Sequence, residues 1–178
     1  MKKTVLSLLL LAGLGMAANA QQGATNKISA GLELALPTGD NADVFSFGYG
    51  ASVQGEFNIV KNLNLTANAG YLSFRLKKEI KDLLESFGED TKGSGAIPLK
   101  AGAKYFFAGK FYGQAEVGAA ISTDEDGGTA FSYAPGIGIN LPISEKTIVD
   151  LGIRYENWRK DGIGSSFFGL RAAVAFGL

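Results

Sequence analysis

The chain has no cysteine and no histidine, and these two absences exclude several classes of site. Without cysteine there is no disulfide framework, no thiol nucleophile and no zinc site built on thiolates. Without histidine there is no imidazole to activate a nucleophile, to ligate a metal or to carry protons near neutral pH. The formal charge is zero, with 17 basic and 17 acidic residues, so the basic footprint of a nucleic-acid-binding protein is missing as well. We therefore expect no nucleic-acid partner.

The first twenty residues have the three parts of a secretory signal peptide. A positively charged start (MKK) precedes an apolar stretch over 5–17, and a small-x-small cleavage site follows at 18–20. The apolar run is shorter than the roughly 20 residues that a membrane-spanning helix needs. We expect cleavage after Ala20, with residues 1–20 as the signal peptide and residues 21–178 as one exported domain.

The rest of the chain alternates between apolar and polar residues with period two, which predicts strands with two different faces. Eight segments carry the pattern: 28–36, 45–59, 63–71, 97–107, 111–121, 131–141, 149–155 and 168–178. No charged residue lies on the apolar face of any of these segments. The alternation predicts an all-β protein with eight antiparallel strands.

The connections between the predicted strands alternate between short and long. Short ones lie at 60–62, 108–110 and 144–147, and longer ones cover 37–44, 72–96, 122–130 and about 156–167. Short turns at one end and long loops at the other are typical of outer-membrane barrels, whose short turns are periplasmic. We expect an up-and-down transmembrane β-barrel with both termini at the periplasmic end.

The composition of the polar face indicates which side of the sheet meets the lipid. Apart from its charged residues it is mostly Gly, Ser and Ala, and an eight-stranded barrel is just wide enough inside for side chains. The large aliphatic residues of the other face would overfill that interior. Aromatic residues such as Phe45, Tyr71 and Phe168 cluster towards the strand ends, as in interfacial girdles. The apolar face is therefore expected outside; the alternative is a soluble periplasmic barrel that binds a hydrophobic ligand inside.

Two stretches carry a likeness to a known family: IPLKAGAKYFFAGKFYGQAEVGAAI over 97–121 and the junction Ala20-Gln21-Gln22. The chain resembles the small eight-stranded outer-membrane barrels of the OmpA-barrel and OmpX type, and more closely the outer membrane protein β-barrel or porin-family proteins of Bacteroidetes-like bacteria. Such barrels usually end in an aromatic residue, whereas here Leu178 is last and Phe176 stands two before it.

This resemblance implies a location in the outer membrane of a Gram-negative bacterium, in contact with lipid and lipopolysaccharide. It also implies insertion by the barrel-assembly machinery. The expected role is membrane integrity, adhesion or loop-mediated binding, with an extracellular ligand or a host surface as the partner.

Nine charged residues fall at inward-facing positions of the predicted strands. They are Glu33, Glu56, Glu116, Asp150 and Glu156 together with Lys100, Lys104, Arg154 and Arg171. We interpret the set as a salt-bridged plug, because an interior of this size is barely wide enough for its own side chains. The alternative is a narrow porin-like channel for ions or small solutes, in which the same residues line the pore.

The predicted pairing of strands brings several of these charges together. Across the 108–110 hairpin Glu116 falls opposite Gly102, so that Lys100 and Lys104 lie on its two diagonals, within reach of long side chains. Closure of the first strand on the last brings Glu33 near Arg171. Arg154 and Glu156 are then expected beside that pair.

The sequence gives no indication of catalysis. Known families of outer-membrane acyltransferases, deacylases, phospholipases and omptin-type proteases depend on a catalytic histidine, which this chain lacks. The inward carboxylates are better explained as partners of the lysines and arginines. The acidic run at 124–128 does not have the spacing of a twelve-residue EF-hand loop, and we interpret it as a solvated turn. We expect no enzyme, no cofactor and no metal site.

The longest connection contains the segment KKEIKDLLESF at 77–87. Its apolar residues recur at helical spacing, which predicts a short helix. We expect this helix to fold over the barrel mouth; the alternative is a helix that docks a partner or lipopolysaccharide. Near the same rim, Trp158, Arg159 and Lys160 are expected to anchor the barrel to lipid headgroups.

Overall fold

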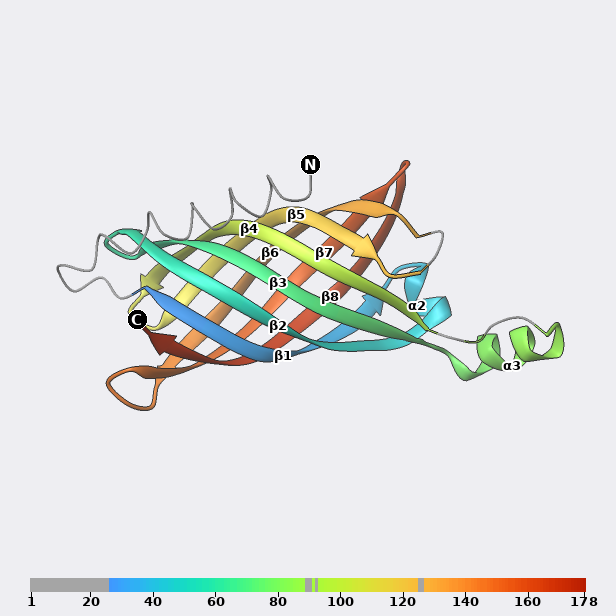
Figure 1. The fold of residues 1–178 in the computed structure, drawn as a ribbon, viewed down its shortest axis with the longest axis horizontal. Coiled ribbons are helices and arrows are strands. Elements are labelled where there is room, and N and C mark those ends of the chain that lie inside the picture. The colour runs from blue at the N-terminus through green and yellow to red at the C-terminus, as the bar shows by residue number, and fades with distance from the viewer. Residues whose placement is uncertain (1–25, 89–90, 92, 125–126) are drawn as a thin grey trace, which may run out of the picture.

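Eight antiparallel strands form one closed barrel in the computed structural model, which describes residues 26–88, 91, 93–124 and 127–178 (Figure 1). The strands are β1 (Lys27–Thr38), β2 (Phe45–Val60), β3 (Leu63–Leu76), β4 (Ser94–Ala108), β5 (Phe111–Ser122), β6 (Thr129–Pro142), β7 (Thr147–Lys160) and β8 (Ile163–Gly177). Each strand pairs with its neighbours in the chain, and β1 closes on β8. The predicted all-β, up-and-down barrel is confirmed. The predicted signal peptide lies outside the described residues.

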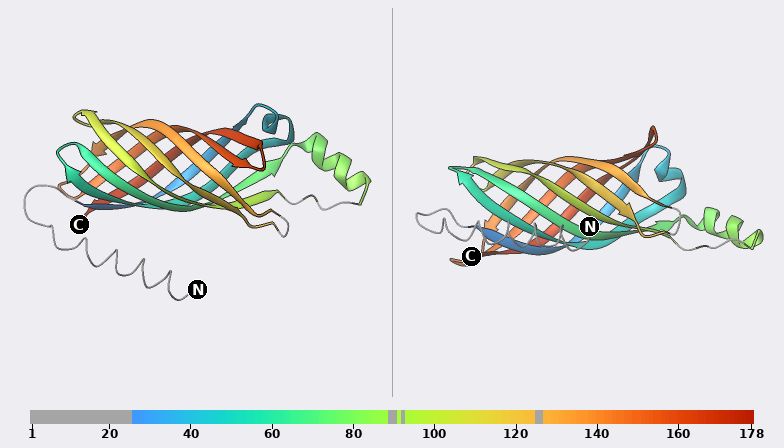
Figure 2. Two further views of the ribbon diagram at one scale, coloured as in Figure 1. Left: turned by 90° about the horizontal axis from the view of Figure 1, so that it is seen from above. Right: turned by 45° about the horizontal axis from the view of Figure 1, so that its top comes forward.

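The two ends of the barrel differ as the connection lengths predict. The β2–β3, β4–β5 and β6–β7 turns lie at the end where β1 begins and the chain finishes (Figures 1 and 2). Helices α2 (Asn41–Val44) and α3 (Lys78–Ser86) lie at the other end. Within the described part of the chain, no helix is long and apolar enough to cross a bilayer.

Three strands extend five residues beyond their predicted limits, and this corrects one connection. β7 continues to Lys160 and β8 begins at Ile163, so the long loop predicted at about 156–167 is wrong. The two strands are joined by Asp161 and Gly162, whose φ angles are 51° and 84°. Asp-Gly suits a two-residue hairpin turn because both central positions need positive φ. β3 likewise runs five residues past its predicted end.

The apolar face of the barrel points outward, as predicted. Large side chains such as Leu32 and Ile137 are exposed over the outer surface, at 72% and 61% of their area. The inward face holds small and polar residues, and the backbones approach closely there: a Cβ on Gly118 would overlap the carbonyl oxygen of Leu99. An apolar exterior is suited to lipid, and the soluble alternative with its apolar interior is wrong.

Helix α3 does not fold over the barrel mouth. It projects beyond the end of the barrel, away from the strands, in all three views (Figures 1 and 2). The helix buries none of its residues, and Leu83 is exposed over 54% of its area. The predicted helix is present, but its expected packing position is wrong.

Candidate functional site

The nine charged residues predicted to face inward all lie in the barrel lumen, along with Lys27. Lys27 lies at the end with the short turns, which we call the periplasmic end after its predicted orientation, and the end with α2 and α3 is called the extracellular end. Most are almost completely buried; the side chains of Lys104 and Glu156, for example, have no exposed area. Buried charges are tolerated only when they are paired and hydrogen-bonded. The pairing in this lumen therefore decides what the site can do.

The periplasmic half of the lumen is centred on Lys104. Its Nζ atom binds Glu56 and lies 2.8 Å from Oδ2 of Asp150. The Tyr112 hydroxyl donates to Oδ1 of Asp150 at 2.5 Å, and the Lys104 ammonium stands 4.2 Å from the centre of the Tyr112 ring. At the rim, Nζ of Lys27 lies 3.4 Å from Oε2 of Glu56. Lys104 is thus held by two carboxylates and one aromatic face.

The next part of the lumen is centred on Glu33, which binds two arginines. Its Oε2 atom is 2.8 Å from Nη1 of Arg154, and its Oε1 atom is 3.4 Å from Nε of Arg171. Arg171 also reaches back to Oδ2 of Asp150 at 3.7 Å. Nε of Arg154 continues to Oε2 of Glu156 at 2.6 Å. The register places Glu33 directly opposite Arg171 across the β1–β8 pair.

Glu156 connects this part to the last pair of charges. Its Oε2 atom accepts from Nζ of Lys100 at 2.8 Å, and Lys100 lies 3.6 Å from Oε2 of Glu116. Its Oε1 atom accepts from the Trp158 indole at 2.8 Å and from the Ser132 hydroxyl at 3.2 Å. Every oxygen of this buried carboxylate therefore has donors.

Together these contacts make one continuous chain of charges, which we call the lumen ion chain. Nine ion pairs link ten residues in the order Lys27, Glu56, Lys104, Asp150, Arg171, Glu33, Arg154, Glu156, Lys100 and Glu116. Cations and anions alternate strictly, so each inner residue stands between two opposite charges. Among the described residues, the lumen ion chain contains five cations and five carboxylates and has no net charge.

Two features of the lumen ion chain differ from the sequence-based expectations. Glu116 does lie opposite Gly102, but only Lys100 of the two diagonal lysines pairs with it. Lys104 turns across the lumen to Asp150 instead. Lys27 was missed because it precedes the first predicted segment by one residue. Its inward position follows from the same alternation, two residues before the inward Ser29.

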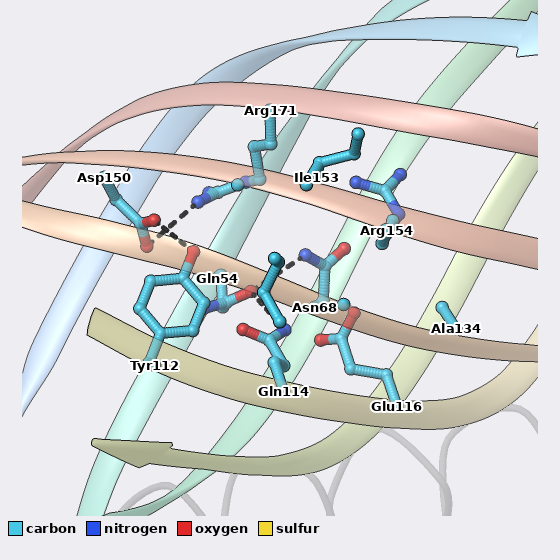
Figure 3. A pocket seen from close by; sticks show the side chains of 13 residues that line it. Gln54, Asn68, Tyr112, Gln114, Glu116, Ala134, Asp150, Ile153, Arg154 and Arg171 are labelled. Atoms are coloured by element: carbon cyan, nitrogen blue, oxygen red, sulfur yellow. Dashed lines mark hydrogen bonds and ion pairs between the residues drawn. The ribbon is translucent and has the colours of Figure 1, made fainter. Parts of the chain in front are cut away.

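Uncharged amides occupy the centre of the lumen (Figure 3). The side-chain amides of Asn68 and Gln114 both donate to Oε1 of Gln54, at 3.2 and 3.4 Å. Beside them, between Tyr112 and Arg154, is a cavity of about 30 Å³. A space of this size is of the order of a single water site.

The extracellular end of the lumen is closed by aromatic side chains, a group that the sequence analysis missed. Phe74 and Phe167 are buried with Leu72, and their ring centroids are 5.4 Å apart. Trp158 packs edge-on against both phenylalanines, at 5.7 and 5.1 Å, and Phe45 lies 5.8 Å from Phe74. We call Phe45, Leu72, Phe74, Trp158 and Phe167 the aromatic cap.

The aromatic cap corrects two predicted positions. Trp158 does not anchor the rim to headgroups. It lies two residues after the inward-facing Glu156, so it also points inward, and its indole N–H donates to that carboxylate. Phe45 does not lie on the outer face, because the β2–β3 register shifts between Phe45 and Phe47. A bulge of this kind reverses which residues point inward.

In the acidic turn, the Asp124 carboxylate accepts two hydrogen bonds, and the longer of them, at 3.4 Å, comes from the backbone N–H of Gly95. The Ser94 hydroxyl donates to Oδ2 of Asp124 at 2.7 Å, and residues 125–126 lie outside the described residues. Within the described residues, no three or more carboxylates are grouped as a metal site would require.

The closed barrel, its apolar exterior and its ionic lumen define a transmembrane β-barrel protein. A family model described as "Outer membrane protein beta-barrel domain" matches residues 6–176, and the chain belongs to this family. The protein is thus an outer-membrane protein. A search of curated proteins found no match to this chain.

Solved structures of outer-membrane barrels have the same fold. Neisserial surface protein A is 15% identical, with a TM-score of 0.61, over 88% of this chain and all of that chain. Ail of Yersinia pestis is 12% identical, with a TM-score of 0.57, over 86% of this chain and all of that chain. OprG of Pseudomonas aeruginosa is 10% identical, with a TM-score of 0.55, over 87% and 96%. At these identities the likeness concerns the fold alone.

Proposed function

We propose that this protein is a non-conducting outer-membrane barrel with a structural and surface-interaction role. The observation that carries the proposal is the filled lumen. The lumen ion chain occupies its length and the aromatic cap closes its extracellular end, with only about 30 Å³ left at the centre.

The energetics of the ion pairs support a plug. A conducting path would have to separate buried partners such as Lys100 and Glu156, whose side chains are 1% and 0% exposed. Removing one partner of a buried pair typically costs about 3–5 kcal/mol, so displacing several at once is very unfavourable. The lumen ion chain alternates in sign and has no net charge, so it offers no excess charge that would select a permeant ion.

The surface-interaction part of the proposal rests on the extracellular end. Helix α3 projects away from the barrel and exposes Leu83 and Phe87, which favours contact with an extracellular ligand or host surface. On the outer face, the Arg75 guanidinium lies 5.4 Å from the Tyr49 ring centre, a position suited to a lipopolysaccharide headgroup. We further propose that the barrel-assembly machinery inserts the protein through β8, whose last aromatic residue is Phe176.

Conductance of the folded protein in planar lipid bilayers tests the plug. We expect no unitary current steps from the wild-type protein. Steps in the wild type whose ion selectivity shifts in Lys104→Ala or Arg154→Ala, but not in the turn variant Lys110→Ala, would establish a narrow channel instead. Heat-modifiable gel mobility verifies that each sample is folded before recording.

Complementation of deletion cells separates the two parts of the role. Cells that lack the protein are supplied with wild type or with a variant in which residues 77–88 are replaced by a short turn. Uptake of a hydrophobic dye reports membrane integrity, and adhesion to host cells reports surface interaction. We expect the shortened variant to restore integrity and to fail in adhesion.

A further inference from the structure

A second cavity lies above the aromatic cap, at the extracellular mouth. Its volume is about 100 Å³, more than three times that of the central cavity. Phe45, Phe74, Trp158 and Phe167 contribute its aromatic lining, and Trp158 and Phe45 are only partly buried. The cavity is thus lined by aromatic groups at a place where water and solutes reach the barrel.

The remaining described lining of this mouth cavity is uncharged and mostly polar. It comes from one proline and from side chains that include Asn41, Ser94 and Ser165. The hydroxyls of Ser94 and of Ser166, which also lines the cavity, are already engaged, with Asp124 at 2.7 Å and with Thr38 at 3.0 Å. The contact from the Ser165 hydroxyl to Oδ1 of Asn41 is long, at 3.5 Å. These two groups therefore have hydrogen-bonding capacity to offer a ligand.

We propose that the mouth cavity binds one small aromatic molecule that carries a single uncharged polar group, with the size and chemistry of a phenol. An apolar cavity of about 150 Å³ binds one benzene, so the mouth cavity, at about 100 Å³, holds at most one ring, whose edge can extend through its open side. A mostly aromatic pocket with a few convergent polar groups is typical of small-molecule sites.

The lining also determines which ligands are excluded. A charged molecule would lose its hydration without gaining a partner, because none of the described residues that line the mouth cavity is charged. A sugar of similar size carries several hydroxyl groups, and the one weakly engaged Asn41–Ser165 pair cannot satisfy them. The ligand does not pass further, since Phe74 and Phe167 are buried beneath it. This binding goes beyond the proposed structural role and does not depend on conduction.

The fluorescence of Trp158 tests the proposal directly, because it is the only tryptophan in the chain and lines the mouth cavity. Folded full-length protein in lipid vesicles is titrated with phenol, with excitation at the red edge of tryptophan absorption. We expect a saturable change in emission. Benzoate, which has the same ring with a charge, and glucose are expected to give no saturable change.

Cavity-filling variants separate binding from partition into the lipid. Ser165→Leu extends a side chain into the mouth cavity and is expected to weaken phenol binding at least tenfold. Asn41→Leu fills it from outside the sheet and is expected to do the same if Ser165→Leu does not fold. The matched control Ser86→Leu, on α3 and away from the cavity, is expected to bind as the wild type does.

Three results would overturn the proposal. The first is a linear, non-saturating change with phenol that is equal in all variants, which indicates partition into lipid only. The second is wild-type affinity in folded Ser165→Leu or Asn41→Leu. The third is saturable binding of benzoate or glucose in place of phenol. None of these results bears on the conductance test, so the two proposals fail separately.

Discussion

The membrane-spanning part of the barrel and its extracellular end differ in the polarity of the side chains that point inward. In the membrane-spanning part, Lys104 and Glu116 point inward while the residues that follow them, Tyr105 and Val117, are exposed outward. At the extracellular end the order reverses: Phe74 and Trp158 point inward, and the residues that follow them are arginines. The alternation of side chains is the same at both ends, but the polarity of the two faces is exchanged.

This reversal of polarity is explained by the medium that surrounds each part of the barrel. Where the outer face meets lipid, apolar groups must be outside and the polar groups of the lumen must pair with one another. Beyond Tyr71 and Tyr155 the outer face carries the exposed Arg75 and Arg159, as expected where it meets water, and apolar side chains pack inside. The aromatic cap is therefore a small core of the kind that soluble proteins have. One barrel therefore contains both kinds of interior.

Removal of a lumen cation should have the largest effect on stability. Lys104→Ala leaves Glu56 and Asp150 buried without their shared partner, and we expect a loss of about 3–5 kcal/mol in the free energy of unfolding. Urea titration in phospholipid vesicles, read by heat-modifiable gel mobility, measures it. The control Lys110→Ala, in an exposed turn, should stay within about 0.5 kcal/mol of wild type. Equal stability of the two variants would mean that the ion chain is not a structural plug.

Truncation in the aromatic cap should come next. Phe167→Ala removes a ring that is 2% exposed and touches Phe74 and Trp158. We expect a loss of about 3 kcal/mol, as for other buried phenylalanines. The same urea titration measures it, with Phe168→Ala on the lipid face as the matched control. A larger loss in the control would contradict the assignment of Phe167 to a core.

The double variant Lys104→Ala and Phe167→Ala tests whether the ionic and the aromatic interior contribute independently to the free energy of unfolding. The two residues share no contact partner, since Lys104 contacts Glu56, Asp150 and Tyr112. Their effects should therefore add to within about 0.5 kcal/mol. A double-mutant cycle from the same titrations gives the coupling. A coupling above about 1 kcal/mol would show that the ionic and aromatic interiors form a single unit.

The smallest effect is expected for an ion pair outside the barrel. Lys81 and Glu85 lie 3.6 Å apart on α3, with about half of each side chain exposed. Solvent screens such pairs, and Lys81→Ala should change the free energy of unfolding by no more than about 0.5 kcal/mol. The urea midpoint is expected to coincide with that of the wild type. A shift near that of Lys104→Ala would mean that burial is not what gives the lumen pairs their strength.

The reversal of polarity also explains which parts could be predicted from the sequence. Period-two alternation with apolar residues on one face identified all eight strands and placed nine charged residues inside. The alternation fades at the membrane boundary, so β3 and β7 were predicted to end near it. If the alternation of inward and outward residues is continued beyond Tyr71 and Tyr155, it places Phe74 and Trp158 inside. The Asp161-Gly162 turn was a visible hairpin signal as well.

Other features could not be predicted from the alternation of apolar and polar residues. The bulge that turns Phe45 inward has no local sequence signature, because it depends on the pairing of β2 with β3. The choice of Lys104 between Glu116 and Asp150 depends on the distance across the lumen. Strand alternation gives the face of a residue and the register gives its neighbours, but contacts across the lumen require the closed barrel.

The lumen ion chain has a consequence for assembly. Several of its pairs join residues on strands that are not hairpin neighbours, 56 positions apart for Lys100 and Glu156 and 121 for Glu33 and Arg154. A single hairpin cannot supply these partners, because they face each other across the lumen of the closed barrel, in which β1 pairs with β8. A half-closed barrel would hold unpaired charges against lipid, so such intermediates are penalised. Charge compensation and closure therefore occur together, and folding of this barrel is expected to be all-or-none.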